Sequence, residues 1–414
     1  MSGTVSPRAE QHAPPAGVAV LASDDEALAA ADAFAAEIRP GAIARDHEAR
    51  LPFAELEELA RTGLLGIRVP RALGGAEVSN TVLTEVVRRI AVADPAIAQI
   101  PQNHWAFVET ITRFGSDAQR TFFCAEFLRG ARLGNALAER GGKTARDWTT
   151  RLTRRADGTL RLDGRKYYTT GALTAQWIPV FCRDQGGEMV AVYVPRDAPG
   201  VEVHQDWTAF GQRATFSGTT VLDGVAVDPA WVVRRPLAQP EPTTVAAFGQ
   251  IIHAAIDAGI ARGALQDGAA FLRERARPWS EAGVDRAADD PQIVRLAGEL
   301  ETQVRAAEAL LVAAATALDV ADAALGGDAG AEAITEARLA VAAAKAFAGE
   351  VALRVATEIF DFSGASAADS AHGLDRHWRN ARTHTLHDPA RSKHLHLGRW
   401  AIDGVGPAAD QVLI

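Results

Sequence analysis

Residues 290–318 have the sequence DPQIVRLAGELETQVRAAEALLVAAATAL, which sets the architecture of the C-terminal half. Asp290 followed by Pro291 is typical of a helix start, because aspartate accepts from the free N–H groups and proline fits the first turn. Apolar side chains then recur at helical spacing, at Ile293, Leu296, Leu300, Val304, Ala307, Leu311, Ala314 and Leu318. The stretch predicts one long helix with an apolar stripe.

A second long helix is expected after the break at Gly326 and Gly327. Its apolar stripe runs from Ile334 to Ile359, and Gly364 marks its end. Two long helices with a short connection pack antiparallel, so they predict the core of a four-helix bundle. We assign this bundle to residues 241–414.

Upstream of the bundle the pattern changes to short runs rich in β-branched and aromatic residues, separated by turn-forming pairs. The pairs are Asp157-Gly158, Asp163-Gly164, Gly186-Gly187 and Asp223-Gly224. We expect an all-β domain at residues 133–240, a small barrel that ends in a linker with Pro236, Pro240 and Pro242.

The N-terminal part is helical again. Residues 51–60 and 80–93 both have helical periodicity and plausible boundaries. We assign residues 21–132 to a helical domain and residues 1–20, rich in Pro, Gly and Ala, to a disordered tail. The expected fold class is therefore mainly α, with a central β-barrel domain.

Composition excludes several classes of protein. The net charge of −9 argues against nucleic-acid binding, which needs a basic face. No apolar run reaches the roughly 20 residues that span a bilayer, so no membrane contact is expected. Cys124 and Cys182 form no CxxC pair. We expect a cytoplasmic protein with two buried thiols.

The chemistry is concentrated in residues 375–389, DRHWRNARTHTLHDP, where three arginines and three histidines stand in an otherwise acidic protein. Arginine grips phosphate with a rigid fork, and histidine exchanges protons near neutral pH. Phosphate-binding groups beside proton-transfer groups predict a cofactor enzyme.

The order of domains and several motifs resemble the acyl-CoA dehydrogenase superfamily over about residues 24–404. Arg379-Asn380-Ala381-Arg382 stands where those enzymes have Arg-Asp-Ala-Arg. Residues 166–172, KYYTTGA, are similar to their strand against the flavin, and residues 134–139, GNALAE, to their flavin loop. The resemblance implies a helical domain, a β-barrel and a C-terminal four-helix bundle.

The departures from that pattern indicate a narrower branch. The catalytic glutamate of the dehydrogenases is replaced at Asp388, which Pro389 follows, and His384 and His387 precede it. This stretch resembles the flavin-dependent monooxygenases of dibenzothiophene desulfurisation and the sulfur-acquisition oxidoreductases of the SfnB type. The resemblance implies reduced FMN from a separate flavin reductase, and oxygen from O2 inserted into a small organosulfur substrate through a flavin C4a-hydroperoxide.

Three residues are the catalytic candidates. His387 could supply the hydrogen bond and proton that oxygen transfer needs; the alternative is a histidine that caps a helix end before Pro389. His104 could be a polar group of the flavin and substrate pocket, or a histidine at the edge of the core. Asn135 could contact the flavin, or simply form a turn.

The remaining candidates concern the cofactor and the substrate. Thr169 and Thr170, expected in a strand, could bond the flavin ring. Arg379 could bind its phosphate, as could Arg277, which by resemblance reaches the flavin of a neighbouring subunit. His384 is a further candidate near the cofactor, with a structural role as the alternative. Trp207 could form a wall of the substrate pocket, although most tryptophans are core residues.

Alternatives remain at this stage. His384, His387 and Asp388 have ligand types that suit a metal triad, although we expect no metal. The protein could be an FAD-dependent acyl-CoA dehydrogenase in which Asp388 acts as the base, or an inactive flavin-fold scaffold. We also expect a homotetramer, because the alanine-rich long helices favour close packing and this fold completes its flavin site with a neighbour.

Overall fold

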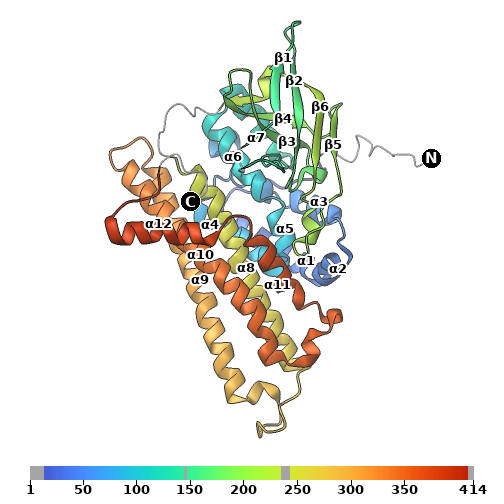
Figure 1. Ribbon diagram of the computed structural model, residues 1–414, viewed down its shortest axis with the longest axis vertical. Helices are drawn as coiled ribbons and strands as arrows, with labels where there is room; N and C mark the ends of the chain where they lie inside the picture. The colour runs from blue at the N-terminus through green and yellow to red at the C-terminus, as the bar shows by residue number, and fades with distance from the viewer. Residues whose placement is uncertain (1–13, 144–146, 235–242, 409–414) are drawn as a thin grey trace, which may run out of the picture.

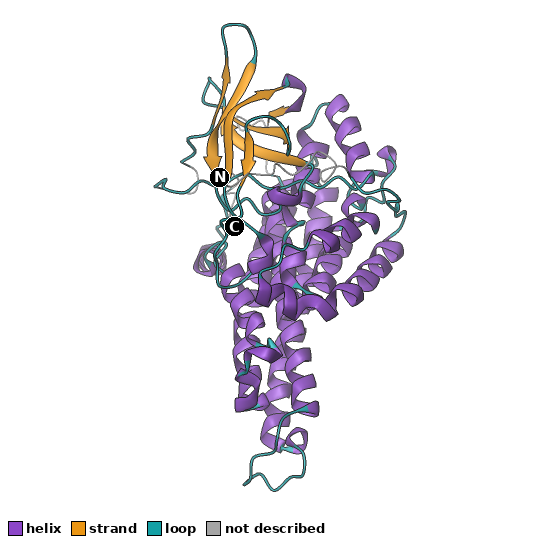
Figure 2. Ribbon diagram, turned by 90° about the vertical axis from the view of Figure 1, so that its right-hand side faces the viewer, coloured by secondary structure: helices purple, strands orange, loops and turns teal. Residues whose placement is uncertain are grey.

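The computed structural model describes residues 14–143, 147–234 and 243–408 (Figure 1). A β-sheet lies at one end, and three long helices extend from it to the other end (Figures 1 and 2). The N-terminal helices are α1 (Asp24–Ile38), α2 (Ala42–Glu48), α3 (Phe53–Arg61), α4 (Asn80–Ala93), α5 (Pro95–Gln99), α6 (Gln102–Phe114) and α7 (Asp117–Leu128).

The helices expected at residues 51–60 and 80–93 are confirmed as α3 and α4. The predicted disordered tail, residues 1–20, needs a correction at its C-terminal end. Residues 1–13 lie outside the described residues, but Ala19 already donates its N–H to the carbonyl of Arg61 over 2.9 Å. Gly63 permits this contact, since a Cβ there would lie 2.3 Å from the oxygen of Ala19. The chain is therefore docked before residue 20.

The sheet has seven strands in the order β5-β6-β2-β1-β3-β4-β7. Their bounds are β1 (Arg151–Arg154), β2 (Leu160–Lys166), β3 (Trp177–Arg183), β4 (Met189–Pro195), β5 (Val201–Val203), β6 (Thr220–Val227) and β7 (Val232–Arg234). Within the described residues the edge strands β5 and β7 do not pair with each other, so the predicted barrel is wrong. One apolar face of the sheet is covered by α6 and α7, where Phe107 and Phe123 pack against Tyr193, and a second apolar cluster lies among the strands β1 to β6.

Two of the four predicted turns are confirmed, since Asp157-Gly158 and Gly186-Gly187 connect consecutive strands. The other two predictions are wrong, because Asp163-Gly164 lies inside β2 and Asp223-Gly224 inside β6. The ladder between these strands is irregular at this point, and the N–H of Gly224 donates to Asp163 Oδ1 over 2.7 Å. The expected linker prolines fall outside the described residues.

The C-terminal part contains α8 (Val245–Glu274), α9 (Pro291–Ala323), α10 (Gly330–Ser363), α11 (Asp375–His384) and α12 (Ala390–Asp403). Both long helices predicted from the sequence are confirmed. Asp290 Oδ1 accepts from the N–H of Gln292 over 2.8 Å at the start of α9, and Gly364 follows the end of α10. None of the helices in the described chain combines the length and apolarity needed to cross a bilayer.

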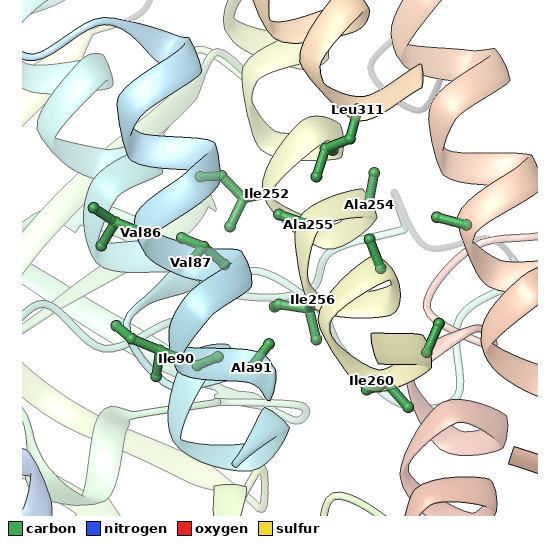
Figure 3. Packing of buried hydrophobic residues seen from close by; sticks show 14 of the residues in the cluster. Val86, Val87, Ile90, Ala91, Ile252, Ala254, Ala255, Ile256, Ile260 and Leu311 are labelled. Atoms are coloured by element: carbon green, nitrogen blue, oxygen red, sulfur yellow. The ribbon is translucent and has the colours of Figure 1, made fainter. Parts of the chain in front are cut away.

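Helix α8 lies in the middle of the molecule and is buried along most of its length. Ile252 and Ile256 point towards Val87 and Ile90 of α4 (Figure 3), so one core joins the N-terminal helices to the bundle. The same buried helix also carries His253 and Asp257. Polar groups at such depth need partners, and those partners lie on α11.

Candidate functional site

His387 follows the end of α11 and has one free edge. Its Nδ1 lies 2.9 Å from Asp388 Oδ1, and its ring packs against that of His253 with centroids 3.9 Å apart. Its side chain is still 41% exposed. Packing of the inner face lowers the pKa of His387, although Asp388 opposes this shift. The exposed edge makes His387 the histidine of this region that a bound molecule can reach.

Asp388 is buried between two lysines. Lys345 of α10 lies 2.8 Å from its Oδ1, and Lys393 of α12 bonds its Oδ2. Burial alone would raise the pKa of Asp388, but the hydrogen bond from His387 and the two ammonium charges outweigh it and hold the pKa well below its usual range. Asp388 is thus a carboxylate that accepts from the Nδ1–H of His387. The nitrogen of His387 that remains for chemistry is Nε2.

His384 is enclosed by protein. Its Nδ1 lies 2.6 Å from Asp257 Oδ1, and its Nε2 lies 2.9 Å from Nδ1 of His253. Its side chain has no exposed surface. Because both ring nitrogens are engaged by side chains of α8, His384 has no ring nitrogen left for the direct contact with the cofactor that we expected.

A cleft of about 510 Å³ opens beside these residues, between α10 and the junction of α11 with α12. Both buried carboxylates, Asp257 and Asp388, line it. Lys345, Arg382 and Arg391 add positive charge to its walls. The cleft gives small solutes access to the carboxylates that hold His384 and His387.

A second polar cluster lies where loops of the sheet domain meet. The half-buried Asn135 donates from Nδ2 to the carbonyl of Tyr168 over 3.2 Å, and its buried Oδ1 has no hydrogen-bond partner. Gly134 has a packing role, because a Cβ there would lie 2.5 Å from the Cα of Ala172. The oxygen of Asn135 is thus a hydrogen-bond acceptor that no donor of the described residues satisfies.

Thr169 and Thr170 do not lie in a strand, since β2 ends at Lys166. The chain turns sharply at Tyr168, whose φ is +59°. Thr169 Oγ1 donates to the carbonyl of Gly218 over 2.9 Å, and Thr170 Oγ1 lies 2.6 Å from Ser217 Oγ. Both hydroxyls therefore join two loops of the sheet domain, so the expected strand placement is wrong.

Trp207 is half-buried and belongs to an aromatic group with Tyr167 and Tyr168, at centroid distances of 6.4 and 6.1 Å. Its Nε1 donates to the carbonyl of Gln212 over 3.0 Å. Gln212 in turn donates its N–H to Asn380 Oδ1 of α11 over 2.6 Å, while both polar atoms of its own side chain are buried without partners. These contacts join the aromatic wall to α11.

His104 does not face a pocket, so its expected role at the flavin and substrate is not supported. The ring is completely buried, Nε2 lies 2.9 Å from the carbonyl oxygen of Leu65, and Nδ1 accepts from the N–H of Leu133 over 3.2 Å. Burial lowers its pKa to about 4. A neutral ring that spans two backbone segments is a structural residue of the N-terminal domain.

Arg379 is not free to bind phosphate, in contrast to our expectation. Its guanidinium bonds the carboxylate of Asp46 and also Asp375 Oδ2, the latter over 2.7 Å. A third contact goes to the carbonyl of Phe210 over 3.1 Å. Arg277 is exposed beyond the end of α8, on the connection that lies at the tip of the molecule away from the sheet (Figure 1). Within one chain it is remote from both polar clusters.

The metal alternative gains no support from the described ranges, where no three His, Cys, Asp or Glu side chains are placed to hold an ion. Sequence reasoning missed His253, Asp257 and the two lysines. A signal was present, since residues 251–257 have the sequence IIHAAID, with a histidine and an aspartate four residues apart in an apolar run. That spacing puts both side chains on one helix face.

Most of the chain matches a known protein family. Residues 24–131, 136–225 and 251–391 match the N-terminal, middle and C-terminal domain models of acyl-CoA dehydrogenase. The chain belongs to the acyl-CoA dehydrogenase family. It is 34% identical to a dibenzothiophene monooxygenase of Rhodococcus erythropolis, over 98% of this chain and 98% of that protein.

Two further relatives refine the position of the chain in the acyl-CoA dehydrogenase family. It is 30% identical to the probable FMNH2-dependent monooxygenase SfnC of Pseudomonas putida, over 92% of this chain and 96% of SfnC. The structure of FMN-bound TdsC from Paenibacillus sp. A11-2 superimposes with a TM-score of 0.86 at 29% identity, over 92% of this chain and 98% of TdsC. The predicted resemblance to the desulfurisation branch is confirmed.

Proposed function

We propose that the protein is an FMNH2-dependent monooxygenase that inserts one oxygen atom of O2 into a small organosulfur compound. The two sequence relatives above support this activity, because they match nearly the whole chain. A separate flavin reductase would supply the reduced FMN. The two unpaired, buried cysteines of the protein itself, Cys124 and Cys182, suit a reducing cytoplasm.

One observation favours oxygenase over dehydrogenase chemistry. Asp388 stands where the resemblance places the dehydrogenase base, yet it is 4% exposed and held by two lysines and His387. A carboxylate with such a depressed pKa is a poor base for a carbon-bound proton. The accessible proton-exchanging group is Nε2 of His387, which also argues against an inactive scaffold.

The polar residues of this site suit the ring of a flavin better than they suit the two phosphates of FAD. Asn135 Oδ1 and the side-chain amide of Gln212 are buried without partners, and unsatisfied groups at such depth are expected to bind a ligand. They would hold polar edges of FMN. When bound, the reduced flavin supplies the electrons that activate O2.

The chain itself would bind, orient and protonate. Tyr168 and Trp207 offer ring faces and edges to a sulfur compound, a contact that sulfur favours, and the buried ring of Tyr167 packs behind them. His387 would hold or deliver a proton at Nε2, while its Nδ1–H stays hydrogen-bonded to Asp388. Asn380 of α11 ties the loop of Trp207 to the helix that ends at His384, so the two halves of the site are joined.

The decisive experiment is a turnover assay with a flavin reductase, NADH, FMN, O2 and a panel of organosulfur compounds. Oxygenated product that appears only with both reductase and FMN supports the proposal. Reduction of bound FAD by an acyl-CoA, without oxygenation of any sulfur compound, would support the dehydrogenase instead.

FMN is expected to bind at least as well as FAD. Arg379 is already occupied by Asp46 and Asp375, so this guanidinium is not free for the second phosphate of FAD. Titration of the protein with reduced FMN and reduced FAD, followed by fluorescence under anaerobic conditions, measures this directly. FAD bound much more tightly than FMN would contradict it.

The protein is also expected to form a homotetramer. Helix α9 exposes apolar side chains along its outer surface, at Val294, Leu310, Val312 and Val320. A second copy would cover them, and Arg277 could then reach a neighbour's flavin. Light scattering should give about four times the chain mass, and Val312→Asp should reduce it. A stable monomer that binds FMN would refute this expectation.

A further inference from the structure

Four side chains behind the exposed edge of His387 form a continuous series. Asp257 Oδ1 lies 2.6 Å from Nδ1 of His384, and Nε2 of His384 lies 2.9 Å from Nδ1 of His253. The ring of His253 then packs on the ring of His387 at 3.9 Å, with an angle of 31° between the planes. Three of the four come from helices α8 and α11, whose packing therefore determines where His387 lies.

The hydrogen-bond directions follow from the carboxylate. Because Asp257 accepts, His384 donates from Nδ1, and in the neutral form its Nε2 must accept from the Nδ1–H of His253. Burial lowers the pKa of His253 well below its usual value, and the positive charges of Lys345 and Lys393 act in the same direction. His253 is therefore a neutral ring whose plane is set by His384.

His387 is held from two directions. His253 supports its face, and Asp388 holds its Nδ1–H at 2.9 Å. The charged and titratable groups around it are His253 from α8, Lys345 from α10, His384 from α11, and Asp388 with Lys393 from the α12 side. Because one face and one edge of the His387 ring are fixed, its Nε2 points in a single direction.

We propose that Asp257, His384 and His253 are positioning residues, which fix the ring of His387 so that Nε2 faces the reacting molecules. The catalytic consequence rests on the function proposed above, whereas the positioning itself does not. Nothing in this role requires the three residues to touch substrate or flavin.

The outer end of the series is accessible, which makes the proposal testable by chemical rescue. Asp257 lines the 510 Å³ cleft beside Gly349 of α10. A Cβ at position 349 would lie 3.7 Å from Asp257 Oδ2 and 3.2 Å from Cγ2 of Thr385. The absence of a side chain there leaves space next to the carboxylate, so formate could replace the carboxylate in Asp257→Ala.

The first measurement is the ¹⁵N NMR spectrum of the histidine rings in flavin-free protein. His253→Ala is expected to shift the Nδ1 and Nε2 signals of His387 towards each other, because a ring without its supporting face leaves Asp388 part of the time and then exchanges between its two tautomers. His253→Phe keeps an aromatic face and should largely preserve them. The matched control is His377→Phe, which removes another buried histidine of α11 that pairs with an aspartate of α8, Asp267, at 2.9 Å. It should leave His387 unchanged.

The second measurement is product formation per FMNH2 consumed. Asp257→Ala and His253→Ala should reduce it by about 10- to 100-fold with FMN affinity preserved, since small misplacement of a reacting group has effects of this size. Formate should restore part of the loss in Asp257→Ala, but not in Asp257→Ala with Gly349→Val, whose side chain fills the space. Unchanged His387 signals in His253→Ala would overturn the proposal. Failure of wild-type turnover would overturn only the proposed function.

Discussion

His387→Ala is expected to bind reduced FMN nearly as well as the wild-type protein, yet to form about 10²–10⁴-fold less oxygenated product. The ring makes one side-chain hydrogen bond, to Asp388, and its Nε2 edge is open. Its removal therefore takes away a proton-exchanging group while the buried carboxylate keeps both lysines. The electrons of FMNH2 should then appear mainly as hydrogen peroxide.

Stopped-flow spectroscopy with parallel measurement of peroxide and product tests this expectation. His387→Asn should recover only part of the coupling, because an amide can donate a hydrogen bond but cannot supply a proton. If His387→Ala retains normal coupling, His387 is a structural residue at a helix end. The proton would then come from water, since both nitrogens of His104 are bonded to backbone groups.

Local signals in the sequence were sufficient for the helices. The Asp290-Pro291 start and the Gly364 end of the long helices need only capping and periodicity, and both were predicted correctly. The barrel was wrong because strand patterns show which face is apolar, but not what covers that face. Here α6 and α7 cover one apolar face while the strands β1 to β6 enclose a second apolar cluster, and this long-range arrangement leaves no local signal.

The sequence motifs named candidate site residues but did not show which partners hold them. His387 was singled out from its motif, but whether a polar residue faces a ligand or a buried partner depends on the opposite helix. Arg379 shows this most clearly, because the anion that it binds is the carboxylate of Asp46, more than three hundred residues earlier in the sequence. His384 was likewise predicted to contact the cofactor. Its actual partners, Asp257 and His253, were not recognised because they lie in an apolar run of α8.

Asp388→Ala is expected to destabilise the fold by about 3–5 kcal/mol, because it leaves Lys345 and Lys393 buried without a counter-charge. The matched control is Glu299→Ala, which removes an exposed pair with Arg295 and should cost less than about 1 kcal/mol. Urea unfolding of the apoprotein at pH 7 measures both changes. Loss of the carboxylate should also free the Nδ1–H of His387, so activity should fall together with stability.

The pH dependence provides a second test of Asp388. Its folded-state pKa is depressed, so its contribution to stability is present above the unfolded pKa, near 4, and is lost as the pH falls below that value. The free energy of unfolding of Asp388→Asn should therefore fall less than that of the wild-type protein between about pH 5 and about pH 3, a range that brackets the unfolded pKa of aspartate. If Asp388→Ala costs no more than the exposed control, the two buried lysines do not depend on this carboxylate, and the explanation of its depressed pKa by their charges is wrong.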